Sequence, residues 1–192
     1  MTDVFPTQQQ ILAELAEAER RAGWLAACEE AGRYLVLSRE LVEALFVAIG
    51  TLPGPVLEVC AGRGELAEAL RGGGLDVIAA DADPPPGSAV VRAAAAEAIE
   101  RYEPATVIGC FVPFDAGVDR AALAAPSVWN YLVLNARLGG QLGSRELWTT
   151  PGWSRAPLPQ VAEWMITRHD VWLGAHRPLL KHGEAWLLRR TG

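Results

Sequence analysis

Hydrophobic residues near the start of the chain recur at helical spacing. They stand three or four positions apart, which places their side chains on one face of a helix. The pattern predicts one or two amphipathic helices over residues 7–30. The recurring residues are Ile11, Leu15, Ala18, Ala22 and Leu25.

A further helix is predicted to begin after Ser38, a residue type that caps helix N-termini, and to end at Gly50. Leu41 and Leu45 fall on its apolar face. Pro53 and Gly54 then form a turn signal, and beyond it the pattern changes.

Short apolar runs follow, and helical stretches at 65–71 and 93–102 separate the first of them. Such alternation is typical of a parallel sheet, because right-handed crossovers place helices on both of its faces. The sequence therefore predicts an α/β, doubly wound fold. The runs read as strands are 56–60, 75–80, 89–92, 105–111 and 131–135.

The last third of the chain has a different amino-acid composition. From Gly139 to Leu158 it is rich in glycine, proline and tryptophan and is predicted as loop, followed by a helix over 159–167. Two final strands, 169–173 and 184–190, are too close for a crossover and suit an antiparallel pair. We expect one compact domain over 38–192, preceded by a helical extension over 1–37 that serves as a lid.

Composition narrows the choice of function. The 192 residues are 51% hydrophobic and 21% charged, and their net charge of -6 argues against a nucleic-acid surface. No apolar run approaches the roughly 20 residues that span a bilayer, and the start lacks a signal peptide, so a cytoplasmic protein without a membrane partner is expected. Three cysteines without a paired motif predict no metal site. The sequence carries no signal for an oligomeric state.

The strongest chemical signal is a glycine turn between the first strand and its helix. Gly62 and Gly64 let the backbone turn sharply and let a ligand approach closely. Asp81 follows 17 positions after Gly64, at the end of the second strand. An acid there can accept both hydroxyls of a ribose. Turn and acid together predict a nucleoside site.

This segment resembles the class I S-adenosylmethionine-dependent methyltransferases. Their first motif is an acid followed by alternating glycines, and 58–64 matches it with Cys60 in place of the first glycine. The resemblance covers about 38–190 and implies a Rossmann-like, mostly parallel seven-stranded sheet with an antiparallel C-terminal strand pair. It implies S-adenosylmethionine as cofactor, with Glu58 at its amino-acid end and Asp81 at its ribose. The implied cofactor-binding set is Glu58, Cys60, Ala61, Gly62, Gly64, Asp81, Ala82, Ala95, Ala96 and Phe111.

Three interpretations of the same residues stay open. The first is a methyltransferase acting on a small molecule. The second is a binding or scaffold protein that keeps the fold without catalysis, because Cys60 replaces a glycine and Ala95 stands where the family often has an adenine-binding aspartate. The third is an NAD(P)-binding protein, since 62–67 also fits the dinucleotide fingerprint. Glu58 argues against the third, because its charge would repel a diphosphate.

The acceptor side is less defined. Pro113 and Phe114 match part of a motif found after the fourth strand of nitrogen-methylating members, and Asp115 beside them is a candidate catalytic base or an ordinary loop residue. Tryptophans of the C-terminal half are either an aromatic substrate wall or core. They are Trp129, Trp148, Trp153, Trp164 and Trp172.

Overall fold

The computed structural model describes residues 4–114, 116–136, 143–168, 170 and 183–192. Within these ranges, no helix combines the length and apolarity needed to cross a bilayer. The helices are α1 (Gln8–Ala16), α2 (Ala18–Glu30), α3 (Arg39–Gly50), α4 (Glu65–Gly72), α5 (Ala95–Tyr102), α6 (Val118–Ala124), α7 (Arg145–Thr149) and α8 (Pro159–Ala162). The strands are β1 (Leu35–Val36), β2 (Val56–Val59), β3 (Val77–Asp81), β4 (Val91–Arg92), β5 (Thr106–Cys110), β6 (Asn130–Ala136), β7 (Trp153–Pro157), β8 (Ile166–Thr167) and β9 (Gly183–Arg190).

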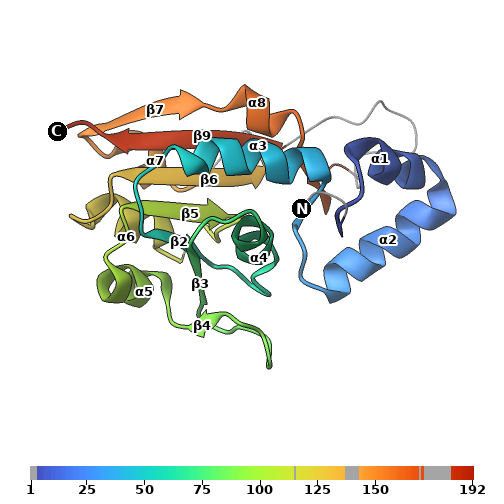
Figure 1. Ribbon diagram of the computed structural model, residues 1–192, viewed down its shortest axis with the longest axis horizontal. Helices are drawn as coiled ribbons and strands as arrows, with labels where there is room; N and C mark the ends of the chain where they lie inside the picture. The colour runs from blue at the N-terminus through green and yellow to red at the C-terminus, as the bar shows by residue number, and fades with distance from the viewer. Residues whose placement is uncertain (1–3, 115, 137–142, 169, 171–182) are drawn as a thin grey trace.

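Seven strands form one mixed sheet in the order β4-β3-β2-β5-β6-β9-β7 (Figure 1). Strands β4, β3, β2, β5 and β6 run parallel to one another, whereas β9 is antiparallel to both β6 and β7. The chain order reverses at β2, which lies between β3 and β5. The predicted doubly wound sheet with an antiparallel pair near the C-terminus is confirmed.

Local capping explains where the first helices begin. Thr7 and Gln10 form a capping box at α1, and the side chain of Ser38 accepts a hydrogen bond from the Leu41 N–H at the start of α3. These contacts satisfy N–H groups that the first turn of a helix leaves without a partner. The predicted helix start after Ser38 is therefore confirmed.

The core consists of two apolar layers, one on each face of the sheet. Along β2, Leu57 and Val59 belong to the layer covered by α5 and α6, and Val56 belongs to the layer covered by α3, α4 and α8. Strands β5 and β6 alternate in the same way, so the central strands are buried on both faces, as parallel strands require. This burial accounts for the continuous apolar runs in the sequence.

The region 139–158 was expected to be loop, and that expectation is wrong where the structure describes it. It contains α7 and β7, and β7 is the edge strand that pairs with β9. Only Trp153 is buried along β7, so the strand lacks the apolar alternation that marks a half-buried strand. The helix over 159–167 is also shorter than expected, since α8 ends at Ala162 and β8 follows. Of the expected strand 169–173, only Asp170 lies within the described residues.

The N-terminal helices pack on a third, smaller apolar cluster. Ile11 and Leu15 of α1 and Cys28 of α2 contact Val36 and Ile166. The last two belong to β1 and β8, which form a separate two-stranded sheet. This small sheet holds the segment between α2 and α3 against the C-terminal half, and Figure 1 shows α1 and α2 near the ends of the central strands.

Gly109 in β5 lies at a closely packed position of the core. A Cβ there would lie 2.6 Å from Oη of Tyr131, whose ring is fully buried and whose hydroxyl donates to Oδ1 of Asp119 at 2.7 Å. We expect Gly109→Ala to lower the free energy of unfolding by about 1–3 kcal/mol, because the ring cannot move without losing packing or that bond. Denaturant titration measures the change. Gly72→Ala is the control, since a Cβ at Gly72 meets nothing within 4 Å. Equal stability of the two variants would contradict the prediction.

Candidate functional site

A cavity of about 260 Å³ lies at the carboxyl ends of β2, β3 and β5. Open α/β sheets bind ligands at this edge, next to the point where the strand order reverses. The segment 31–37, which follows α2, forms the opposite wall. We call this cavity the first chamber. It is lined by Ala31, Gly32, Arg33, Tyr34, Leu35, Leu37, Glu58, Cys60, Ala61, Gly62, Arg63, Glu65, Leu66, Asp81, Cys110, Phe111 and Pro113.

The turn between β2 and α4 uses left-handed backbone at three positions. Gly62 and Gly64 have φ angles of 54° and 78°, and Cys60 has a φ of 55°. Glycine adopts this region freely, but a side chain costs roughly 1–2 kcal/mol there. Cys60 stands where the methyltransferase motif has its first glycine, and its backbone adopts a conformation that glycine favours. Gly64 also permits a close approach, because a Cβ there would lie 2.7 Å from Cγ2 of Val90.

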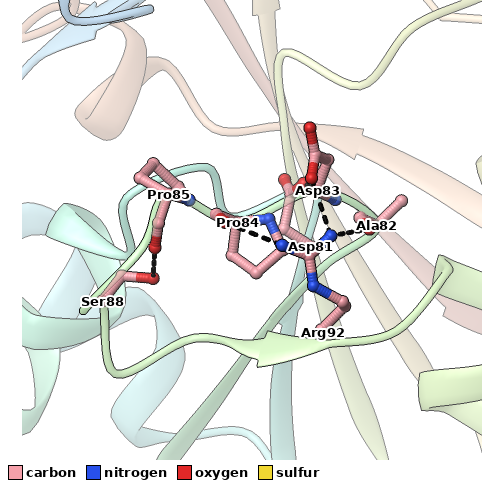
Figure 2. A network of polar contacts seen from close by, with 7 residues as sticks. All are labelled: Asp81, Ala82, Asp83, Pro84, Pro85, Ser88 and Arg92. Carbon is pink, nitrogen blue, oxygen red and sulfur yellow. Dashed lines mark hydrogen bonds and ion pairs between the residues drawn. The ribbon is translucent and has the colours of Figure 1, made fainter.

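Asp81 joins the end of β3 to this turn. Its Oδ2 accepts a hydrogen bond from the Gly62 N–H at 2.8 Å, and its Oδ1 accepts from the Asp83 N–H at 2.9 Å. Figure 2 shows the loop beyond it, where Arg92 pairs with Asp83 at 2.7 Å and also donates to the carbonyl oxygens of Ala82 and Pro84. The carboxylate that is the candidate ribose acceptor is therefore held in one orientation.

Glu58 is the most buried carboxyl group of the first chamber, with 2% of its surface exposed. Its Oε2 accepts a hydrogen bond from the Ala67 N–H at 2.9 Å, in the first turn of α4. Burial raises the pKa of Glu58 to about 8, although the Ala67 N–H and Arg71 oppose the rise and Asp81 adds to it. Near neutral pH the side chain of Glu58 is therefore largely neutral, which weakens the charge argument against a diphosphate.

The wall formed by 31–37 supplies residues that the sequence did not single out. Arg33 forms two hydrogen bonds with Glu65, from Nε at 2.8 Å and from Nη2 at 2.6 Å. Tyr34 stacks on Phe111 with ring centroids 5.6 Å apart. The guanidinium carbon of Arg168 lies over the Tyr34 ring, 3.7 Å from its centroid. No motif spacing links 31–37 to the glycine turn, so only folding reveals that they meet.

Six of the ten predicted cofactor residues line the first chamber: Glu58, Cys60, Ala61, Gly62, Asp81 and Phe111. The other four do not line it. Gly64 caps α4, Ala95 packs against the core at the start of α5, and Ala82 and Ala96 are exposed. Asp115 lies outside the described residues, as does Trp172. Trp153 is core rather than substrate wall, since its ring is buried and its Nε1 donates to the Leu123 oxygen.

The remaining chemistry of the chamber is limited by burial. Burial raises the pKa of the Cys60 thiol to about 11 and that of Cys110 well above its usual value, so both stay protonated near neutral pH. Arg33 lowers the pKa of Glu65, which keeps that carboxylate ionised. Within the described residues, no group of three or more histidine, cysteine or acidic side chains is placed to hold a metal ion.

No family model and no curated protein matches the chain. Solved structures do match. The chain is similar to the 1,6-didemethyltoxoflavin-N1-methyltransferase of Burkholderia thailandensis, solved with S-adenosylhomocysteine, at 14% identity over 97% of this chain and 91% of that chain, with a TM-score of 0.51. It is also similar to the 23S rRNA methyltransferase ErmE, at 18% identity over 83% of this chain and 70% of that one, with a TM-score of 0.50. At these identities the likeness shows the fold, which is that of the class I methyltransferases.

The left-handed conformation of Cys60 reverses the usual order of two substitutions. In a strand, replacing alanine by glycine lowers the stability of the folded protein by about 0.5–1 kcal/mol. At Cys60 we expect Cys60→Gly to be more stable than Cys60→Ala by about 1 kcal/mol, because both lose the thiol and only glycine relieves the backbone. Thermal unfolding of the two variants measures the difference. Ala79→Gly, in β3, is the control and should show the usual loss; the same loss at Cys60 would contradict the assignment.

The raised pKa of Glu58 gives a second prediction. Between pH 4.5 and about 8 the folded chain keeps this proton and the unfolded chain does not, so stability is lost as pH rises through that window. Each unit of pKa corresponds to about 1.36 kcal/mol. The variant Glu58→Gln keeps an acceptor for the Ala67 N–H but cannot ionise. We expect the difference in free energy of unfolding between this variant and the unmodified chain to shift in favour of the variant by at least ~2 kcal/mol from about pH 5 to about pH 9. Denaturant titrations over this pH range measure the difference. If the free energies of unfolding of the two proteins changed with pH in the same way, Glu58 would be ionised when buried, which would contradict the prediction.

Proposed function

We propose that the chain binds S-adenosylmethionine in the first chamber and transfers its methyl group to a small-molecule acceptor. The observation that carries the proposal is the meeting of Asp81 with the glycine turn at the carboxyl edge of a sheet with methyltransferase topology. A nucleoside and an amino-acid group must both be held for this cofactor. The chamber offers polar groups for each.

The ribose would be held by Asp81. Each carboxylate oxygen has a second lone pair beside the N–H bond it already accepts, so two hydroxyls can still donate to it. The adenine would lie beyond, toward Ala82, Ala95 and Ala96, where the chain offers methyl groups and backbone rather than an acid. Phe111 would close the other side with its ring.

The amino-acid end would lie near Arg33, Glu58 and Glu65. The guanidinium of Arg33 can pair with a carboxylate in the forked geometry that it now uses for Glu65. An ammonium ion near Glu58 would favour its ionised form and lower its pKa. The first chamber, at about 260 Å³, is slightly smaller than typical ligand cavities of roughly 300–1,000 Å³. We therefore assign the segment 31–37, together with α1 and α2, as the lid that opens for the cofactor.

When bound, S-adenosylmethionine would supply a methyl group on a positively charged sulfur. In-line attack by an acceptor atom on that carbon would break the carbon–sulfur bond and release S-adenosylhomocysteine. The chain's own contribution is alignment and exclusion of water. Tyr34 and Phe111 cover the chamber beside the residues that follow β5, where an acceptor would approach. Asp115 stays the candidate base on its place in the sequence alone.

The dinucleotide alternative is disfavoured by the hydrogen bonds of the turn. A diphosphate is bound by N–H groups that are free at the start of a helix. Here the N–H groups of Gly62 and Ala67 already donate to the carboxyl groups of Asp81 and Glu58, and that of Gly64 donates to the Ala61 oxygen. Three N–H groups of this segment are therefore engaged within the protein.

A binding protein without catalysis is the second candidate. The Tyr34–Phe111 stack favours it, because these rings occupy the space beside the chamber that an acceptor would need. This second candidate keeps the fold with or without the cofactor, and it differs from the first in lacking turnover.

Isothermal titration with S-adenosylmethionine, S-adenosylhomocysteine, NAD and NADP tests the proposal. We expect the first two to bind and the last two to fail. We expect Asp81→Asn to weaken S-adenosylmethionine binding roughly tenfold or more, because hydrogen bonds to a charged acceptor contribute about 1.5–3 kcal/mol. Asp83→Asn is the matched control, since its side chain is 90% exposed and pairs with Arg92, and should change the affinity less than about twofold.

Thermal unfolding of the Asp81 variant separates lost binding from a disturbed turn. Binding of NAD or NADP in place of S-adenosylmethionine would overturn the proposal. Cofactor binding without S-adenosylhomocysteine production over a panel of small-molecule acceptors would favour the binding protein.

A further inference from the structure

A second and larger cavity, of about 740 Å³, lies between α4 and the N-terminal helices. It shares Arg33, Leu37 and Glu65 with the first chamber, so the Arg33–Glu65 pair stands between the two. We call it the second chamber. Its lining is Val4, Phe5, Pro6, Ile11, Glu14, Trp24, Arg33, Val36, Leu37, Glu65, Glu68, Ala69 and Gly72.

Most of the wall is apolar, and two aromatic side chains contribute to it. Phe5 and Trp24 are both partly buried, and Ile11 and Val36 are buried beside them. An apolar wall of this kind favours a ligand with a hydrocarbon body. Burial of such a body is favourable by about 25 cal/mol per Å² of apolar surface removed from water.

The charged groups of the wall are mostly acidic. Glu14 comes from α1, and Glu65 and Glu68 come from α4. The single guanidinium, Arg33, is already bonded by both Nε and Nη2 to Glu65. Arg71, three positions beyond Glu68, donates instead to the Val77 oxygen. Neither Glu14 nor Glu68 forms an ion pair with any residue in the part of the chain that the structure describes.

We propose that the second chamber binds a small organic ammonium ion with an apolar body. Glu14 and Glu68, both solvent-exposed, supply negative charge that the Arg33–Glu65 pair leaves uncompensated in this wall. Trp24, which also lines the chamber, adds an aromatic ring of the kind that attracts cations. The hydrocarbon part lies against Ile11 and Val36. An anion of the same shape is repelled by the two carboxylates. This site does not depend on the proposed function, because it uses groups outside the turn and Asp81.

Three probes of similar shape and different charge test this directly: phenethylamine, which is an ammonium ion at neutral pH, phenethyl alcohol and phenylacetate. By isothermal titration with the full chain, phenethylamine should bind more tightly than the alcohol, and phenylacetate should bind most weakly. Glu14→Gln and Glu68→Gln should each weaken phenethylamine by about two- to fivefold, the range of partly exposed ion pairs, and leave the alcohol unchanged.

Glu30→Gln is the matched control, because it removes the same charge from an exposed position of α2 outside the chamber. The double variant Glu14→Gln/Glu68→Gln should combine the two losses, to about tenfold. Equal affinity for the amine and the alcohol would overturn the proposal, as would an equal loss in the Glu30 variant. Titration with S-adenosylmethionine reports on the first chamber separately, so failure at one site is distinguishable from failure at the other.

Discussion

The hydrogen bond from the Gly62 N–H to Asp81 is the contact on which the candidate site depends. It joins the turn after β2 to the end of β3, so the candidate ribose-binding acid and the glycine turn have a fixed relation. At the other end of the same turn, Glu58 accepts a hydrogen bond from the Ala67 N–H. Two carboxyl groups thus accept hydrogen bonds from backbone donors of the turn and of the first turn of α4. The proposal of S-adenosylmethionine rather than a dinucleotide rests on this use of the backbone more than on the charge of Glu58.

Backbone strain gathers at the same edge of the sheet. Cys60 follows β2 and Phe111 follows β5, and both have positive φ angles although neither is glycine. Such conformations cost of order 1–3 kcal/mol and persist only where the surrounding structure holds them. Here they direct both residues to the first chamber, where Phe111 meets Tyr34. The strained residues therefore form part of the wall of the first chamber.

The segment 31–37 couples the N-terminal helices to both cavities. Arg33 contacts Glu65 at the start of α4, and Leu35 and Val36 pair with β8. Both cavities include Arg33 and Glu65 in their walls, so the two cavities share this ion pair.

The sequence by itself determined the sheet's central strands, the glycine turn and Asp81, because all of these depend on local patterns: continuous apolar runs, glycine spacing and one βαβ unit. It missed β7, whose single buried residue gives no periodic signal, and it overextended the helix that ends at Ala162. Only the tertiary structure brought Arg33 and Tyr34 to the chamber, since their contacts with Glu65 and Phe111 span chain separations that no local pattern records. It also neutralised Glu58, because the pKa of a carboxyl depends on burial, which sequence position does not reveal.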